Sequence, residues 1–412
     1  MPAANKIIPL MRPQLPKADR LMPYLRRIDS ARIYSNHGPL SVEFGQRLAK
    51  HFGLGKGAAV CASSGTVAIV GSILATAGRA QRKRPLAVVP ALTFAATAAA
   101  AEQCGYEIFL MDIDSDSWML DAQAVGELRV LERVGVVIPV APFGRPVPLA
   151  PWRAFREKTG IPVVIDGAAS FQGVSNAPEI FLGEIPVSLS FHATKCFATG
   201  EGGCVITTDD ECAKRVTQAL NFGIFGVRDS TSPGTNGKMS EYHAAVGLAE
   251  FDGWTEKQRA WRYVAEIYRQ QLTKINLAHR LVATPEIGLN YILFFCNDST
   301  QTNYIQKSLH RHGVSFLNWY GGGLRHQSYY SNCAHARLTV TEKIAPNLIG
   351  LPTAPDMAMR AVMCVAVAIQ EGVTRSLESR NVRTAKQSKA KQYSGKGPVR
   401  FSRVSDKCRP QS

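Results

Sequence analysis

The chain has 412 residues, of which 45% are hydrophobic, and a formal net charge of +16. This length exceeds that of one ordinary hydrophobic core, so at least two domains are expected. The longest stretch of low polarity, residues 86–101, is mostly Ala, contains Pro90 and is too short to span a membrane.

The positive charge is concentrated in residues 374–412. This segment contains eleven Lys or Arg residues and two acidic residues, and so carries +9 of the net charge. It is rich in Ser, Lys, Arg and Gln and poor in apolar residues, a composition typical of disorder. The remaining +7 is spread without a basic helix or a nucleic-acid-binding motif, so nucleic acid is not an expected partner.

The nine cysteines contain no CxxC pair, and their spacing suits neither a metal site nor a redox pair. No apolar segment follows the first residues, so we expect no secretion signal. Reduced thiols, a cytoplasmic location and no bound metal are therefore predicted.

Predicted strands and helices alternate through the first half of the chain. Residues 7–38, with four prolines, are expected to be irregular, and residues 42–49 to form a helix. Strands are then predicted at 58–61, 86–89, 106–111, 136–140 and 163–165, and helices at 65–77, 94–104, 120–133 and 151–158. Such alternation is typical of a parallel sheet with helices on both faces. Ligands bind beyond the carboxyl ends of strands in these sheets, so the residues that follow each strand are the candidate site.

The second half predicts a smaller α+β domain. A helix capped by Asp209 and Asp210 is expected to end at Leu220, and two long helices are expected over 244–254 and 261–272. A strand at 291–295 and helices at 302–312 and 358–369 follow. We therefore divide the chain into a large domain with an N-terminal arm (1–255), a small C-terminal domain (256–373) and a basic disordered tail (374–412).

Lys195 stands between two apolar runs, residues 187–190 and 204–207, that predict buried strands. Burial disfavours the charged form of Lys and leaves a neutral amine that can attack a carbonyl. The best-known carbonyl of this kind is that of pyridoxal phosphate. The alternative is a Lys that extends from a strand end into solvent, since most Lys side chains are exposed. Lys195 alone does not decide between them.

Three further candidate sites follow predicted strands: the helix start at residues 63–66, Phe94 and Asp166. Ser63, Ser64, Gly65 and Thr66 open a helix, where free backbone N–H groups can hold a phosphate, although a plain N-cap is the commoner use of such residues. Phe94 could lie on a cofactor ring or join the core.

Asp166 follows the strand at 163–165, where a buried carboxylate is costly unless it is paired. A protonated pyridine nitrogen is one such partner, and a helix N-cap is the alternative.

The order of these features resembles fold type I pyridoxal-phosphate enzymes, and more narrowly the DegT/DnrJ/EryC1/StrS family of sugar aminotransferases. The resemblance covers residues 8–369 and rests mainly on residues 190–195 with 200–203 and on residues 234–241. Residues 64–66, 90–94 and 351–355 support it. It implies a fold type I α/β transferase, with a mostly parallel sheet and a smaller α+β C-terminal domain.

The resemblance also implies roles for individual residues. Lys195 would be the Schiff-base lysine and proton shuttle, and Asp166 would hold the pyridinium nitrogen. The other residues assigned to the cofactor are Gly65, Thr66 and Ser190 at its phosphate, Phe94 on its ring, and Asn236 at the phosphate of the other subunit's cofactor. Lys238, Tyr320 and His326 are expected to contact the substrate. Ala169 departs from the family pattern, which has His or Gln near the ring hydroxyl; either Ser170 or a water substitutes, or the contact is missing.

The implied activity is transfer of an amino group from an amino acid such as glutamate to a nucleotide-linked keto sugar, in amino-sugar or polysaccharide biosynthesis. Among family members, the chain is most similar to those that aminate C4 of 4-keto-6-deoxyhexoses. A homodimer with shared active sites is expected. The alternatives are a sugar dehydratase, in which the lysine is commonly replaced by His, and a cofactor-binding regulator without catalysis.

Overall fold

The computed structural model describes residues 7–282 and 288–394. The strands of its main sheet are β1 (Ala59–Ala62), β2 (Leu86–Pro90), β3 (Glu107–Met111), β4 (Val134–Val137), β5 (Ile165–Asp166), β6 (Val187–Ser190) and β7 (Gly203–Ile206). Strand β2 pairs in parallel with β3 and β4, and β5 pairs in parallel with β6. Strand β7 is antiparallel to both β6 and β1.

Two parallel bridges, Val137 with Val163 and Val140 with Asp166, join the two halves of this sheet. The order is therefore β3-β2-β4-β5-β6-β7-β1, and the short strand β11 (Ala334–His335) pairs with β3 at one edge. This mostly parallel sheet agrees with the sequence prediction. Asp166 lies at the end of a central strand, flanked by β4 and β6.

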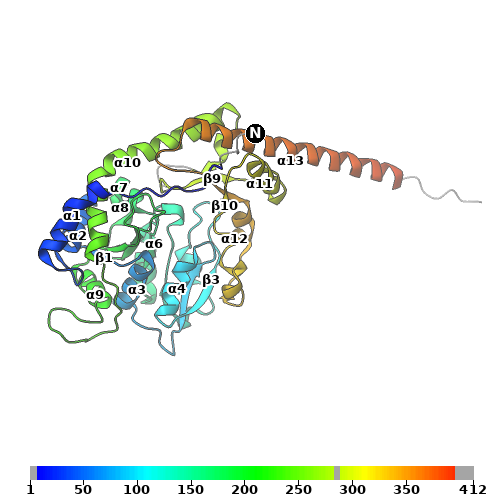
Figure 1. Cartoon of the computed structure of the whole chain (residues 1–412). Helices are drawn as coiled ribbons and strands as arrows, with labels where there is room; N and C mark the ends of the chain where they lie inside the picture. Colours follow the sequence, from blue (N-terminus) through cyan, green and yellow to red (C-terminus); the bar gives the residue numbers. More distant parts are fainter. Residues whose placement is uncertain (1–6, 283–287, 395–412) are drawn as a thin grey trace, which may run out of the picture.

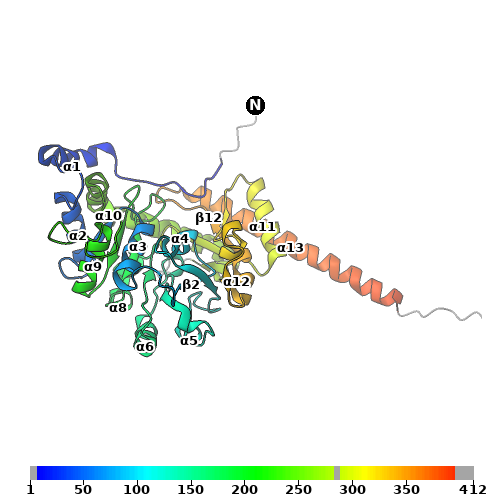
Figure 2. The same ribbon diagram turned by 90° about the horizontal axis from the view of Figure 1, so that it is seen from below.

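Helices cover both faces of the sheet (Figures 1 and 2). The two faces of the sheet pack in separate hydrophobic clusters. In β2, Val88 belongs to one cluster, whereas its neighbours Ala87 and Val89 belong to the other. The helices of the large domain are α2 (Pro39–His51), α3 (Gly65–Thr76), α4 (Ala95–Gln103), α5 (Ala122–Gly126), α6 (Leu149–Thr159), α7 (Phe171–Asn176), α8 (Pro178–Phe181) and α9 (Asp210–Leu220). Helices α3 and α4 contribute Ile69 and Ala98 to the second cluster, whereas α6 contributes Trp152 to the first.

A smaller antiparallel sheet forms the second part of the molecule. Its strands, in order, are β10 (Leu317–Asn318), β12 (Leu348–Leu351), β9 (Ile292–Phe295) and β8 (Leu281–Val282). Helices α10 (Glu241–Lys274), α11 (Ser299–Arg311), α12 (Thr339–Ile344) and α13 (Met359–Ser394) accompany it. This sheet has its own hydrophobic core, which includes Ile267, Ile305 and Val365.

The long helix α10 joins the two parts. The sequence predicted two helices here, but the structure has one continuous helix of 34 residues. Trp254 and Trp261 lie on either side of the expected break and pack in the same core cluster, so tertiary packing holds the helix together. The proposed domain boundary at residues 255/256 falls inside this helix.

The expectation of irregular structure before residue 38 was wrong for residues 18–31, which form helix α1 (Ala18–Ala31). Leu21, Leu25 and Ile28 recur at helical spacing, and Ile28 is buried. Pro23 lacks one backbone donor without ending the helix.

The helix predicted at 120–133 was also wrong. It is divided into α5 and a 3-10 turn at Leu131–Arg133, and α5 ends at Gly126, a weak helix former.

Helix α13 is much longer than predicted, because it continues from residue 369 to Ser394 and reaches beyond the body of the molecule (Figure 1). The expected disorder from residue 374 is therefore wrong for residues 374–394. This stretch has no Gly or Pro and is rich in strong helix formers. Ser376 is buried, and Arg380 forms an ion pair with Asp298. The rest of the predicted tail, 395–412, lies outside the described residues.

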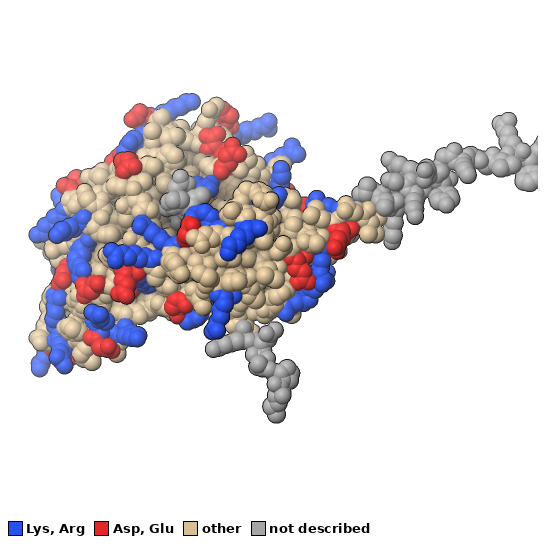
Figure 3. Space-filling view, turned by 90° about the horizontal axis from the view of Figure 1, so that it is seen from above, with Lys and Arg blue, Asp and Glu red and all other residues tan. Residues whose placement is uncertain are grey.

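On the face seen in Figure 3, Lys and Arg side chains are interspersed with Asp and Glu. This mixture differs from the continuous basic stripe by which many proteins bind nucleic acid.

Phe197, two residues after Lys195, supports this part of the fold. It is fully buried and stacks on Phe171 with ring centroids 4.2 Å apart. We expect Phe197→Ala to lower the free energy of unfolding, measured by chemical denaturation, by about 3–5 kcal/mol, because a buried aromatic ring leaves a cavity. Tyr263→Ala, at a side chain that is 59% exposed, is the control and should change it by less than about 0.5 kcal/mol. Equal effects would contradict this packing.

Candidate active site

The loop between β6 and β7 carries Lys195 at the carboxyl edge of the sheet. Within it, the backbone N–H of Phe191 donates to the Gly202 carbonyl at 2.9 Å, and that of Ala193 donates to the Gly200 carbonyl at 2.8 Å. Gly202 is required by close packing, since a Cβ there would lie 2.3 Å from Thr199 Oγ1. The loop is thus fixed by its own backbone bonds, and the half-buried Lys195 projects from it.

Lys195 Nζ donates a hydrogen bond to the hydroxyl of Tyr291 at 3.2 Å. Tyr291 comes directly before β9, so this contact joins the two parts of the molecule. The sequence did not identify Tyr291 as a site residue, because it opens an apolar segment and was interpreted as part of a core strand.

Asp166 is 4% exposed and accepts two hydrogen bonds. Thr97 Oγ1 donates to Oδ2 at 2.6 Å, and the backbone N–H of Ala168 donates to Oδ1 at 3.0 Å. Burial raises the pKa of Asp166, while these hydrogen bonds and the charge of Lys195 oppose the rise. The structure therefore places Lys195 near enough to Asp166 for its charge to influence the carboxyl, and the cost of burying this carboxylate is only partly compensated.

The start of α3 forms a cradle beside the end of β6. Ser64 caps the helix by accepting from the Val67 N–H at 3.2 Å, as the simpler interpretation of this residue expected. A Cβ on Gly65 would lie 2.5 Å from Ser190 Cβ, so only Gly permits this approach of helix and strand. Ser190 Oγ accepts from the His192 N–H at 3.3 Å. Gly65, Thr66 and Ser190 are therefore neighbours at a helix N-terminus, a geometry that suits a phosphate.

Aromatic rings line the next part of the edge. Phe94, at the start of α4, is 61% exposed, so the alternative of a core position does not apply to this residue. Its ring centroid lies 6.2 Å from that of Tyr320, which stacks on Phe143 at 5.4 Å. Burial raises the pKa of Tyr320, and the nearby Tyr291 and Asp166 raise it further. Tyr320 therefore belongs to the same cluster as Lys195 and Asp166.

His326 is exposed on the 3-10 turn Leu324–His326 and packs against Gly322. Within the described part of the chain, no hydrogen bond or ion pair links His326 to the Lys195 cluster. The structure thus supports Tyr320 more strongly than His326 as a site residue.

Asn236 and Lys238 lie beside the start of α3. Lys238 Nζ donates to Asn236 Oδ1 at 2.8 Å and lies 4.4 Å above the ring of Phe222. Burial lowers the pKa of Lys238. The loop is held within its own chain, because the Gly237 N–H donates to the Leu220 carbonyl and the Gly237 carbonyl accepts from the Ser63 N–H, both at 2.8 Å.

Ala169 is nearly buried and packs in a cluster with Phe143 and Tyr291. The neighbouring hydroxyl of Ser170 is fully buried close to Gly167, and it has no hydrogen-bond partner among residues 7–282 and 288–394. Ser170 therefore lies against its own turn, which disfavours the expectation that it replaces the missing side chain at position 169.

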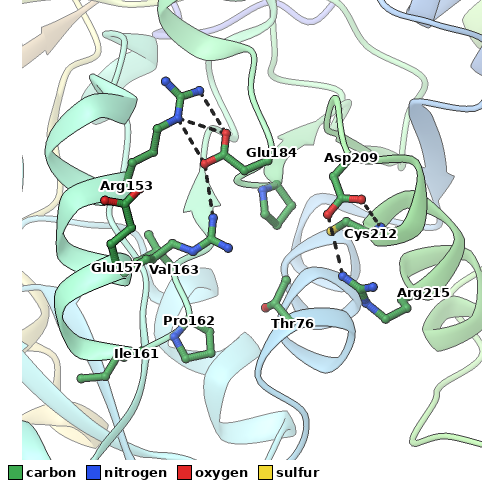
Figure 4. A pocket seen from close by; sticks show the side chains of 13 residues that line it. Thr76, Arg153, Glu157, Ile161, Pro162, Val163, Glu184, Asp209, Cys212 and Arg215 are labelled. Atoms are coloured by element: carbon green, nitrogen blue, oxygen red, sulfur yellow. Dashed lines mark hydrogen bonds and ion pairs between the residues drawn. The ribbon is translucent and has the colours of Figure 1, made fainter.

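A cavity of about 420 Å³ lies at the opposite edge of the sheet (Figure 4). It is lined by residues that precede β5 and β6, such as Val163 and Pro186, so it is separate from the Lys195 cluster. Arg153 pairs with Glu184 at 3.0 Å, and Arg215 approaches Asp209 at 4.0 Å, so its charges are largely compensated.

The described residues contain no group of three or more His, Cys, Asp or Glu side chains suited to a metal ion. Their helices also include none with the length and hydropathy needed to cross a membrane.

The raised pKa of Asp166 predicts how pH affects stability in the protein without ligand. Below about pH 3.9 the carboxyl is protonated in both the folded and the unfolded chain. Above that value the unfolded chain ionises first, so the folded state is progressively penalised until the pH passes the raised pKa. Asp166→Asn lacks this penalty, and its amide oxygen can still accept one hydrogen bond.

We therefore expect the stability of Asp166→Asn relative to wild type, measured by chemical denaturation between pH 4 and 8, to increase with pH. A difference that stays constant or decreases with pH would contradict the burial of an under-compensated carboxylate.

Residues 17–370 match the DegT/DnrJ/EryC1/StrS aminotransferase family. Protein Rv3402c of Mycobacterium tuberculosis strain H37Rv is 30% identical over 385 residues, which cover 89% of this chain and 90% of that protein. The dTDP-4-amino-4,6-dideoxy-D-glucose transaminase of Shigella dysenteriae is 28% identical over 273 residues, or 66% of this chain and 72% of that protein. The solved structure of DesI with its TDP-sugar product has a TM-score of 0.79 at 26% identity and covers 92% of this chain and 97% of its own.

These similarities extend over both the main sheet and the smaller one. They confirm the fold class and the family that the motifs at residues 190–203 and 234–241 predicted. The chain belongs to the DegT/DnrJ/EryC1/StrS aminotransferase family.

Proposed function

We propose that this protein is a pyridoxal-phosphate-dependent aminotransferase that moves an amino group from an amino acid, in the first instance glutamate, to a keto sugar nucleotide. The observation that carries the proposal is the placement of Lys195 and the buried carboxylate of Asp166 at the carboxyl edge of the sheet, where Ser190 lies against Gly65 at the start of α3. An amine, a carboxylate and a helix N-terminus at one edge of the sheet match the aldehyde, the ring nitrogen and the phosphate of this cofactor. The names of the Shigella dysenteriae transaminase and of the DesI complex support a sugar nucleotide as substrate.

The residues present fit the cofactor. Asp166 is buried with its charge only partly compensated, so a protonated ring nitrogen would be a favourable partner. Gly65 lets the start of α3 approach Ser190 closely, and Thr66 and Ser190 supply hydroxyl groups at this helix N-terminus, where backbone N–H groups are free to bind an anion. Phe94 offers an exposed ring face. When bound, pyridoxal phosphate supplies the carbonyl to which a lysine attaches and the electron sink that stabilises a carbanion.

Lys195 is the proton carrier in this proposal. In each half-reaction its Nζ would carry a proton between two carbons: from the α carbon of the amino-acid donor to the bound cofactor in the first, and from the cofactor to the sugar carbon that becomes aminated in the second. A general base must lie within hydrogen-bond reach of the carbon that it serves, and a loop held by its own backbone bonds gives Nζ a defined position. Asp166 would keep the ring nitrogen of the bound cofactor positively charged in both half-reactions.

The substrate contacts are proposed at Lys238 and Tyr320. Lys238 lies beside the cradle with its amine toward Phe222, where it could meet the phosphates of a nucleotide. Tyr320 belongs to a loop that is fixed to the large domain, because the Leu324 N–H donates to the Ala91 carbonyl at 2.8 Å. His326 remains a weaker candidate. The presence of Lys195 argues against a dehydratase that lacks this lysine.

We further propose a homodimer in which Asn236 serves the partner's site. Three apolar side chains of the neighbouring loop are exposed, Phe222 by 50%, Phe225 by 49% and Val227 by 74%. Exposed apolar clusters of this kind commonly mark protein interfaces. A cytoplasmic location also stays a prediction.

Lys195→Ala tests the central assignment. We expect it to abolish transamination and to leave no borohydride-trappable adduct, because the substitution removes the amine proposed to attach to the cofactor. The assay is incubation with glutamate and a panel of keto sugar nucleotides, with products identified by mass. Lys214→Ala, which removes an exposed lysine paired with Glu211, should keep full activity. Wild-type turnover by Lys195→Ala would refute the proposal, and a wild type that binds the cofactor without reacting with glutamate would favour the regulator.

If each active site contains residues from both subunits, two inactive variants should complement each other in a mixed dimer. Inactive Lys195→Ala and inactive Asn236→Asp are mixed, dissociated and reassociated. In a mixed dimer with shared sites, one site carries both lesions and the other carries neither, so up to about half of the wild-type activity per mixed dimer should return. No recovery, despite mixed dimers shown by mass, would mean that Asn236 acts within its own chain.

A further inference from the structure

The side chain of Tyr291 is held rigidly at the boundary between the two parts of the molecule. It is 5% exposed, and its ring meets those of Phe143 and Trp319 edge-on, at 5.4 and 5.6 Å between centroids. Its backbone N–H donates to the Gly288 carbonyl at 2.9 Å, and the Gly288 N–H donates to the Phe143 carbonyl at 2.6 Å. The hydroxyl therefore has a fixed position, 3.2 Å from Lys195 Nζ.

The preceding residue makes a second contact to the lysine loop. Asn290 is 3% exposed, and its Nδ2 donates to the backbone carbonyl of Thr194 at 3.1 Å. Two successive residues before β9 thus contact two successive residues of the loop, one through its backbone and one through its side chain. A single hydrogen bond could be incidental, but this paired contact constrains both the loop and the amine that it carries.

We propose that Tyr291 is a positioning residue for the amine of Lys195, and that it remains hydrogen-bonded to this amine while Lys195 gains and loses its proton. The inference rests on the proposed role of Lys195. A tyrosine hydroxyl accepts a hydrogen bond from a charged amine and donates one to a neutral amine, so it serves both protonation states. Fixing the reacting amine in advance lowers the entropic cost of each proton transfer.

This assignment makes the arrangement of the two parts of the molecule relevant to the chemistry. Lys195 belongs to the main sheet, whereas Tyr291 and Asn290 belong to the segment that leads into the smaller sheet. Any displacement of β9 away from the main sheet would remove the hydrogen bond to Nζ and the contact to Thr194 together. The amine of Lys195 is therefore held in place only while the segment before β9 stays packed against the main sheet.

The test is Tyr291→Phe, which keeps the ring between Phe143 and Trp319 and removes only the hydroxyl. We expect cofactor binding and borohydride trapping to persist, kcat to fall at least about tenfold, and KM for glutamate to stay within about twofold, because a proton-transfer step is affected and ground-state binding is not. The pH midpoint of the absorbance of the lysine-bound cofactor, measured without substrate, should fall by at least about half a unit, because the charged nitrogen loses an acceptor.

Tyr268→Phe is the matched control. Its buried hydroxyl donates to the Pro352 carbonyl at 2.6 Å, and its ring packs in the core of the smaller sheet. This variant should lose thermal stability without changing the absorbance midpoint. Incorporation of 3-fluorotyrosine at position 291 is a second variant that keeps the shape of the residue and weakens the phenol as an acceptor. It should lower the midpoint by less than Tyr291→Phe does.

The outcomes separate the two proposals. A wild-type protein without lysine-bound cofactor would refute the proposed function itself. A wild type that carries the cofactor, together with Tyr291→Phe and fluorotyrosine variants that keep its kcat and its midpoint, would refute only the role of Tyr291. If Tyr291→Phe fails to fold, the midpoint of the fluorotyrosine protein decides alone.

Discussion

The buried charge of Asp166 is the constraint on which the arrangement of this site depends. The carboxylate lies at the end of β5, between β4 and β6, where water does not compensate its charge. Two hydrogen bonds and the charge of Lys195 offset part of the cost, yet its pKa remains raised. The folded chain therefore contains a site that favours a cation. In the proposed function, a protonated ring nitrogen would meet this need, so the cofactor would complete an electrostatic arrangement that the fold has already built.

The parallel sheet explains why the remaining groups collect around this carboxylate. The carboxyl ends of β2, β5 and β6 meet at one edge, so the segments that follow them carry Phe94, Asp166 and Lys195 to the same place. Strand β7 runs the other way, and it brings Gly203 against the start of α3, where a Cβ would lie 2.4 Å from the Ser64 carbonyl oxygen. Close approach of backbones thus shapes the cradle, and the polar side chains are added to its rim.

The sequence predicted the parts of this site in which a residue type contrasts with its surroundings. Asp166 ends one apolar run and Lys195 lies between two others, and so they stand out as site residues. Tyr291 does not, because an amphipathic residue inside an apolar strand has the same pattern whether its hydroxyl is used or not. Its contact with Lys195 joins residues 96 positions apart, which only the closed tertiary structure determines. The prediction of disorder over residues 374–394 failed for a related reason, because a polar segment without Gly or Pro is compatible with both a disordered chain and a helix that continues from a docked one.

The lysine loop is constrained from several directions, and this bears on how the enzyme could work. Glu250 of α10 accepts from the Ala198 N–H at 3.4 Å and forms a buried ion pair with Lys257, whose Nζ also donates to the Gln14 carbonyl at 2.7 Å. The N-terminal segment, α10 and the residues before β9 therefore all contact the loop or its supports. With the backbone held in this way, the freedom that remains belongs to the side chain of Lys195. In the proposed function, proton transfer would then require only small displacements of the Lys195 amine and little reorganisation of the loop, which is the physical advantage of a preorganised site.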